Sequence, residues 1–171
     1  MKKLLLLLLF VPLIGLGQDL SIGNTYQGGI IFYLDSSGEH GLIAAPSDLS
    51  KDAEWGCRGT TITGADGTAI GTGFQNTIDI EAGCSTPGTA ADICANLTLG
   101  GYSDWFLPSK DELNLMYVNL ESQGLGGFGP DIYLSSSEAD AYGAWKQSFI
   151  NGYQLYNSKL YTDEVRAIRD F

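Results

Sequence analysis

The sequence predicts a single α+β domain, because stretches with strand character stand at both ends of the chain and helical stretches lie between them. β-Branched and aromatic residues are frequent in residues 28–45 and again beyond residue 131. Apolar residues recur at helical spacing in residues 89–97 and 110–120. This order indicates mixed or antiparallel sheets, two helices and long irregular loops.

The first two strands form a predicted hairpin. Gly28–Asp35 follows a Gly-Gly turn, and His40–Ala45 returns after a turn at Ser36–Gly38. Residues 47–86, by contrast, are rich in Gly, Thr, Asp and Ser and show little periodicity, so we expect short irregular pieces there. The anchors expected for these pieces are Trp55, Ile70, Phe74 and a disulfide bond.

Capping patterns mark the start of both predicted helices. Thr89 stands three residues before Asp92 in the first helix. Ser109 stands three residues before Glu112 in the second helix. The second helix carries an apolar stripe formed by Leu113, Met116, Tyr117 and Leu120. The neighbouring carboxylates Asp111 and Glu112 would point about 100° apart, so capping and the helix dipole explain them better than acid–base catalysis.

Three strands are predicted near the C-terminus, over residues 132–137, 144–150 and 164–170. Trp145 and Phe149 share one face of the middle strand, and we expect both in the core. The last strand also carries two arginines, Arg166 and Arg169. Either arginine could contact a ligand, but a bidentate pair with an internal carboxylate such as Glu138 or Asp104 is favoured.

The N-terminus has the pattern of a secretory signal peptide over residues 1–17. Two lysines precede an apolar stretch, and Gly15 and Gly17 place small residues before a cleavage point at Gln18. The apolar stretch is shorter than the roughly 20 residues that span a membrane, so no membrane insertion is expected. Residues 18–25 are a short lead, and residues 26–171 form the domain.

The charge of the chain excludes several classes of partner. The net charge is −11, and loss of Lys2 and Lys3 with the signal peptide makes it −13. Such a surface repels phosphate backbones and anionic lipid, so we expect neither nucleic acid nor a membrane surface as a partner.

Three cysteines remain in the predicted mature chain, and an odd count leaves one unpaired. Cys57 and Cys84 lie in Gly-rich stretches, whereas Cys94 lies on a helical apolar stripe with Ala90 and Leu97. We therefore predict a Cys57–Cys84 disulfide and a buried free Cys94.

The sequence offers no recognisable catalytic or metal-binding motif. There is no GxSxG, no GK[ST] after the glycines at 71 and 73, and no CxxC. His40, the only histidine, stands at a strand start, where a structural role is favoured over that of a general base. We expect no enzyme activity and no cofactor or metal site, although a structural calcium ion held by distant segments stays open.

The segment from Asp140 to Asp163 is the candidate binding surface. It is rich in Tyr, Asn, Ser and Gly, a composition typical of adaptable recognition surfaces. The candidate ligand-binding residues are Tyr142, Asn151, Tyr153, Tyr156, Asn157 and Tyr161. An ordinary hairpin whose tyrosines form cross-strand pairs is an equal alternative.

Several stretches together carry a family resemblance across nearly the whole domain. They are Gly28–Tyr33, Gly71–Gly73, Asn76–Thr77, Gly101–Leu113, Ser135–Glu138, Ala144–Trp145 and Val165–Phe171. On these residues the chain resembles the DUF1566 family, also called the Legionella collagen-like protein C-terminal (Lcl_C) domain family. The resemblance implies a C-type-lectin-like fold and an extracellular or surface-bound binding module, in some members an adhesin. It also implies ligand contacts from the segment before the last strand.

These observations predict a secreted, non-catalytic module that binds an extracellular protein or glycan through the Tyr/Asn-rich segment. One alternative is an extracellular structural or matrix module that self-associates. A less favoured alternative is a carbohydrate-acting hydrolase, which needs a cleft with two carboxylates about 5–10 Å apart. The sequence does not predict the oligomeric state.

We predict that the exported protein begins at Gln18, because signal peptidase selects small residues at the positions that Gly15 and Gly17 occupy. Intact-mass spectrometry of secreted material measures this directly. A secreted protein that retained residues 1–17 would contradict the prediction.

Overall fold

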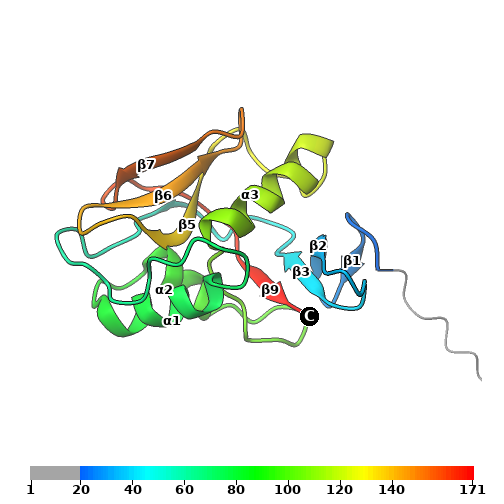
Figure 1. Cartoon of the computed structure of the whole chain (residues 1–171), viewed down its shortest axis with the longest axis horizontal. Coiled ribbons are helices and arrows are strands. Elements are labelled where there is room, and N and C mark those ends of the chain that lie inside the picture. Colours follow the sequence, from blue (N-terminus) through cyan, green and yellow to red (C-terminus); the bar gives the residue numbers. More distant parts are fainter. Residues whose placement is uncertain (1–19) are drawn as a thin grey trace, which may run out of the picture.

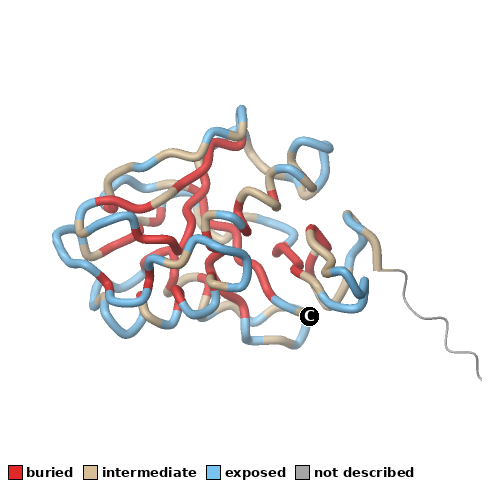
Figure 2. Tube along the Cα trace, in the orientation of Figure 1, coloured by how far each residue is buried: buried red, intermediate tan, exposed pale blue. Residues whose placement is uncertain are grey.

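Over residues 20–171, the computed structural model has two β-sheets and three α-helices, which makes the domain α+β as predicted (Figure 1). The predicted signal peptide and its cleavage point at Gln18 lie outside the described residues. Figure 2 shows that buried residues gather along the inner strands and exposed residues lie in the outer loops.

The first sheet joins the two ends of the domain. Its strands, in the order β1-β2-β3-β9, are β1 (Thr25–Tyr26), β2 (Gly29–Leu34), β3 (Gly41–Ala44) and β9 (Ile168–Asp170). All three pairings are antiparallel, and Ala44 of β3 lies opposite Ile168 of β9. The early hairpin predicted from the sequence is therefore confirmed as β2 and β3.

The second sheet contains the segment proposed to bind ligand. Its order is β4-β8-β5-β6-β7, with β4 (Ser50–Ala53), β8 (Asp163–Val165), β5 (Ile132–Glu138), β6 (Gly143–Ser148) and β7 (Gln154–Ser158). Only the β5–β8 pair is parallel, and β7 lies at the edge with β6 as its single neighbour. The single strand predicted over residues 164–170 is wrong, because this stretch forms β8 and β9 in different sheets.

Both predicted helices are confirmed, with slightly different ends. Helix α2 (Ala90–Ala95) has Thr89 as its N-cap, whose hydroxyl accepts a hydrogen bond from the Asp92 backbone N–H. Helix α3 (Lys110–Asn119) has the full capping box between Ser109 and Glu112, and a short 3₁₀ turn (Glu121–Gln123) follows it.

A third helix, α1 (Gly73–Gly83), lies in the stretch predicted to be irregular, so that prediction is wrong. Its buried residues are Gly73, Asn76, Thr77 and Ile80. They have helical spacing, but two of them are polar and one has no side chain. Hydrogen bonds replace apolar contacts on this face: the Asn76 amide donates to Gly67 O, and the Thr77 hydroxyl accepts from Leu107 N–H. A pattern based on apolar residues therefore does not reveal the helix.

Helix α3 connects the two sheets through the core (Figure 1). Its buried residues Leu113 and Met116 belong to one cluster with Phe32 of β2 and Tyr133 of β5. Phe149, just beyond β6, lies in the same cluster and is buried, as predicted. Burial of one large apolar side chain of this kind contributes about 1.5–3 kcal/mol relative to exposure.

The carboxylate of Glu112 is fully buried at the start of α3 and holds two backbone groups. Oε2 accepts a hydrogen bond from Ser109 N–H, which completes the capping box, and Oε1 accepts one from Gly71 N–H, which belongs to the loop before α1. Burial raises the pKa of the Glu112 carboxyl, against the opposing effect of these hydrogen bonds. The capping role predicted for Glu112 is confirmed, and the contact with Gly71 extends it.

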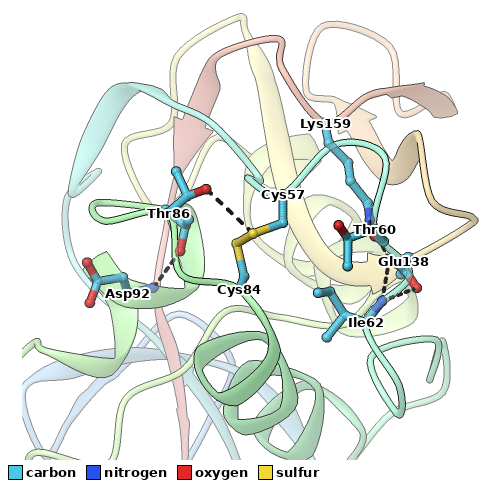
Figure 3. The surroundings of a disulfide bond; sticks show 9 residues. Cys57, Thr60, Ile62, Cys84, Thr86, Asp92, Glu138 and Lys159 are labelled. Atoms are coloured by element: carbon cyan, nitrogen blue, oxygen red, sulfur yellow. Dashed lines mark hydrogen bonds and ion pairs between the residues drawn. A yellow bond between two sulfur atoms is a disulfide. The ribbon is translucent and has the colours of Figure 1, made fainter.

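The predicted Cys57–Cys84 disulfide is present and joins the loop after β4 to the end of α1 (Figure 3). Cys94 is free and buried, again as predicted. Burial raises the pKa of the Cys94 thiol, which disfavours the thiolate needed for disulfide exchange.

We predict that Glu112→Ala lowers the free energy of unfolding by about 2–5 kcal/mol, since the buried N–H of Ser109 and the part-buried N–H of Gly71 lose their acceptor at about 1–3 kcal/mol each. Urea unfolding followed by circular dichroism measures the change. Asp111→Ala is the matched control, because Asp111 is the exposed neighbouring carboxylate and its loss should lower stability by less than about 1 kcal/mol. Equal effects of the two variants would contradict the role given to Glu112.

We predict that the Cys57→Ser/Cys84→Ser double variant is less stable by about 3–4 kcal/mol, because the bond closes a loop with a sequence separation of 27. Denaturant unfolding of the oxidised protein and the variant gives the difference. Non-reducing peptide mapping checks the pairing, and a peptide that linked Cys94 to either partner would overturn it.

Candidate functional site

The six candidate residues lie around the β6–β7 hairpin but do not form one cluster. Tyr142 precedes β6, Tyr156 and Asn157 lie in β7, Asn151 and Tyr153 lie in the β6–β7 turn, and Tyr161 follows β7. The exposed fractions of the tyrosines are 55% for Tyr142, 73% for Tyr153, 50% for Tyr156 and 59% for Tyr161. All four rings are therefore accessible to a partner.

Strand length separates Tyr142 from the residues of the turn. Tyr142 and Tyr153 flank opposite ends of β6, whose six residues extend about 20 Å at 3.3 Å per residue. Asn157 pairs with Ala144 and so points to the opposite face of the sheet from Tyr156. Of the six candidates, Tyr142 and Tyr156 meet at Asp140, and Asn151 accepts a hydrogen bond from Tyr153 N–H within the turn.

The ring of Tyr156 is held by glycine on one side and by a carboxylate at its tip. The ring packs over Gly143, where any Cβ atom would collide with it. Its hydroxyl lies 3.1 Å from Oδ1 and 3.0 Å from Oδ2 of Asp140, to which it donates a hydrogen bond. A half-exposed tyrosine is thus fixed in one orientation without being buried.

Asp140 organises the loop between β5 and β6. Oδ1 accepts hydrogen bonds from the backbone N–H groups of Tyr142, at 2.7 Å, and Gly143, at 2.9 Å. These bonds, led by the one from Tyr142, lower the pKa of the Asp140 carboxyl. The hydrogen bond to the carboxylate in turn raises the pKa of the Tyr156 phenol. Near neutral pH the pair is therefore a carboxylate and a neutral phenol.

Trp145 is only partly buried, so its predicted place in the core is wrong. It lies directly opposite Tyr156 in the β6–β7 ladder and therefore shares the face of that ring. The ammonium group of Lys110, at the start of α3, lies 3.6 Å from the centre of the Trp145 ring. A cation–π contact thus covers part of this indole.

Arg58 reaches the same surface from the disulfide loop. The backbone N–H of Gly59 donates to the carbonyl of Ala141 at 2.7 Å, which places this loop beside the β5–β6 connection. The guanidinium of Arg58 lies 5.1 Å from the centre of the Tyr142 ring. We call the resulting surface the Tyr156 patch, and it consists of Arg58, Lys110, Asp140, Tyr142, Trp145 and Tyr156.

Sequence reasoning missed four members of the Tyr156 patch as site residues: Arg58, Lys110, Asp140 and Trp145. Arg58 and Lys110 are distant in sequence from the hairpin, and no local pattern connects them to it. Trp145 lies within the β6–β7 hairpin itself, and Asp140 lies in the loop that precedes it. Gly143 is the sequence feature that indicates this aromatic surface. It lies two residues before Trp145 on the same strand face, and its lack of a side chain leaves room for a ring from the neighbouring strand.

Two buried lysines anchor the hairpin to other segments of the fold. The ammonium group of Lys146 donates to Asp163 and to the carbonyl of Tyr161, which fixes the turn after β7. Lys159 forms a buried ion pair with Glu138 and donates to the carbonyl of Thr60 at 2.9 Å (Figure 3).

The two C-terminal arginines pair with carboxylates, as the favoured interpretation predicted. Arg169 binds Asp104 at 2.5 Å, which was one of the two partners named, and Arg166 binds Asp48 at 2.7 Å. The other named carboxylate, Glu138, instead pairs with Lys159. Both arginines are therefore engaged inside the fold and do not contribute to the Tyr156 patch.

Over residues 20–171, no group of three or more His, Cys, Asp and Glu side chains is placed to hold a metal ion. In the same range, no helix has the length and apolar character that crossing a bilayer requires.

Comparison with known proteins gives no match: no family model matches the chain, and neither does any curated protein. The functional argument therefore depends on the chemistry of the Tyr156 patch. Three aromatic rings offer apolar faces, Asp140 offers a hydrogen-bond acceptor, and Arg58 and Lys110 offer positive charge.

Proposed function

We propose that this protein is a secreted, non-catalytic binding module that recognises an extracellular protein or glycan through the Tyr156 patch. The observation that carries the proposal is the fixed, half-exposed ring of Tyr156 between Gly143 and Asp140. A ring that is already ordered loses little conformational entropy on binding, so more of its contact energy contributes to affinity.

The composition of the patch supports recognition of a partner over a purely internal role. Tyrosine, tryptophan and arginine are the residues most enriched at energetically important positions of interfaces. Tyr142, Trp145 and Tyr156 leave ring surface uncovered, and the charged groups of Arg58 and Lys110 lie beside two of the rings. Such a surface suits either the aromatic and acidic side chains of a protein or the apolar face of a sugar ring.

Two further observations support the family assignment and the location that go with this function. The α+β architecture with two sheets agrees with the C-type-lectin-like fold that the resemblance to the DUF1566 family implies. In that fold, ligand contacts come from the segment before the last strand, where β6 and β7 lie. The Cys57–Cys84 disulfide and the leader-type N-terminus support secretion.

We expect Tyr156→Ala to reduce affinity by about thirtyfold, the effect of losing a buried interface tyrosine worth about 2 kcal/mol. Protein and glycan arrays first identify a ligand for the mature protein, and calorimetry then measures each variant. Gly143→Ala is a second variant, because its methyl group displaces the Tyr156 ring while the ring itself stays in the protein. Both variants should melt like the parent protein, since Tyr156 is half-exposed.

Tyr153→Ala and Tyr161→Ala serve as matched controls, because both rings are exposed and lie outside the patch. If only these two control variants lost affinity for the ligand, the binding site would lie at the β6–β7 turn or in the segment after β7. Absence of any ligand, together with concentration-dependent association in sedimentation velocity, would favour the self-associating matrix module. The free edge of β7 is the observation that makes this alternative worth measuring.

A further inference from the structure

A cavity of about 430 Å³ lies between α1, α2 and residues 103–106. Its volume is within the range of about 300–1,000 Å³ that is usual for small-molecule sites. Figure 1 shows α1 and α2 along the lower side of the molecule and β6 and β7 along the upper edge. The cavity is therefore distinct from the Tyr156 patch.

The walls of the cavity are mostly apolar. The apolar lining residues are Phe74, Ile78, Ala82, Ala95, Trp105 and Phe106. Phe74 and Ile78 are large hydrophobic residues that remain 45% and 43% exposed on α1. The hydroxyl of Thr77, one of the few polar groups in the lining, already bonds to Gly73 and Leu107. An apolar ligand of matching size would thus find much contact area in the cavity but few neutral hydrogen-bonding partners.

Two carboxylates, Glu81 and Asp104, give the cavity its charge. Asp104 is paired with Arg169, whereas Glu81 is an exposed residue and forms no ion pair within residues 20–171. Partial burial of its carboxyl group, followed by repulsion from Asp92, raises the pKa of Glu81. Asp170 lines a smaller adjoining cavity that shares Asp104, so carboxylates outnumber cations around this site.

The two carboxylates also bear on the hydrolase alternative, which asks for a cleft with such a pair. Asp104 is held by Arg169, and the apolar walls provide few partners for the hydroxyl groups of a sugar. An apolar ligand with a positive charge would pack against the walls and lie near the exposed, unpaired carboxylate of Glu81.

We propose that this cavity binds a small organic cation with an apolar or aromatic body. The body would pack against Ile78, Ala82 and Phe106, and the cationic group would lie near Glu81. The small volume selects a free small molecule over a folded partner, and the excess of carboxylates selects a cation over an anion or a neutral ligand.

Tryptamine and indole-3-propionate test the proposal, since they share an indole and a short chain but carry opposite charges. Titration of the mature protein at neutral pH, followed by amide NMR shifts, locates the site and gives both affinities. Tryptamine should shift the amides of Ile78, Ala82, Ala95 and Ser103, and it should bind at least about tenfold more tightly than indole-3-propionate.

Three variants make the test specific. Glu81→Gln keeps the shape of the side chain and should weaken tryptamine binding about threefold to tenfold. Glu39→Gln removes the same charge from the exposed turn between β2 and β3, and it should leave the affinity unchanged. Ala82→Phe places a ring at an exposed lining position and should abolish binding without disturbing the core.

Equal affinities for the two indoles would show apolar binding without recognition of charge and would overturn the proposal. Equal losses in Glu81→Gln and Glu39→Gln would show a general effect of net charge and would also overturn it. Amide shifts confined to the Tyr156 patch, or no binding at all, would do the same.

Discussion

The buried ion pair between Lys159 and Glu138 is the interaction on which the arrangement of the β6–β7 hairpin depends. Both side chains are almost fully removed from solvent, so each charge requires the other, and loss of one partner of such a pair typically costs about 3–5 kcal/mol. The pair does more than neutralise charge. Glu138 accepts a hydrogen bond from Ile62 N–H, and Lys159 donates to Thr60 O, so the disulfide loop is fastened to the ends of β5 and β7. Together with the hydrogen bond from Gly59 N–H to Ala141 O, these contacts hold the loop from which Arg58 reaches the Tyr142 ring.

The two faces of the hairpin carry different kinds of side chain. Lys146 and Leu155 form one cross-strand pair, and the lysine is directed into the fold toward Asp163. Trp145 and Tyr156 form the next pair, which lies on the opposite face in the Tyr156 patch. Strand alternation therefore lets one pair of strands carry buried ionic anchors and exposed rings one residue apart. The cavity beside α1 and α2 is built from other elements, so occupation of one site requires no change in the residues of the other.

The parts of the fold that the sequence predicts correctly are those that depend on interactions between neighbouring residues in the chain. The N-cap at Thr89 and the capping box at Ser109 involve neighbours in the chain, and both mark helix starts correctly. Helix α1 is not readable, because Asn76 and Thr77 occupy its buried face and bond to groups from other segments. The sequence predicts Trp145 in the core because it shares a strand face with Phe149. Strand β6 ends at Ser148, however, so the burial of Phe149 beyond the strand does not extend to Trp145.

The edge strand β7 has a consequence for the behaviour of the protein in concentrated solution. Its sequence is Gln-Leu-Tyr-Asn-Ser, so it contains no charged residue and no proline. Charged residues and prolines are the usual local features that prevent edge strands of neighbouring molecules from pairing. Protection must then come from the whole surface, whose excess of acidic over basic residues makes molecules repel one another. Such repulsion reaches only about 10 Å at 0.1 M salt and about 3 Å at 1 M. The ionic strength of the surroundings therefore controls the colloidal stability of the protein. At high salt, electrostatic repulsion protects the β7 edge least against pairing with a strand of another molecule.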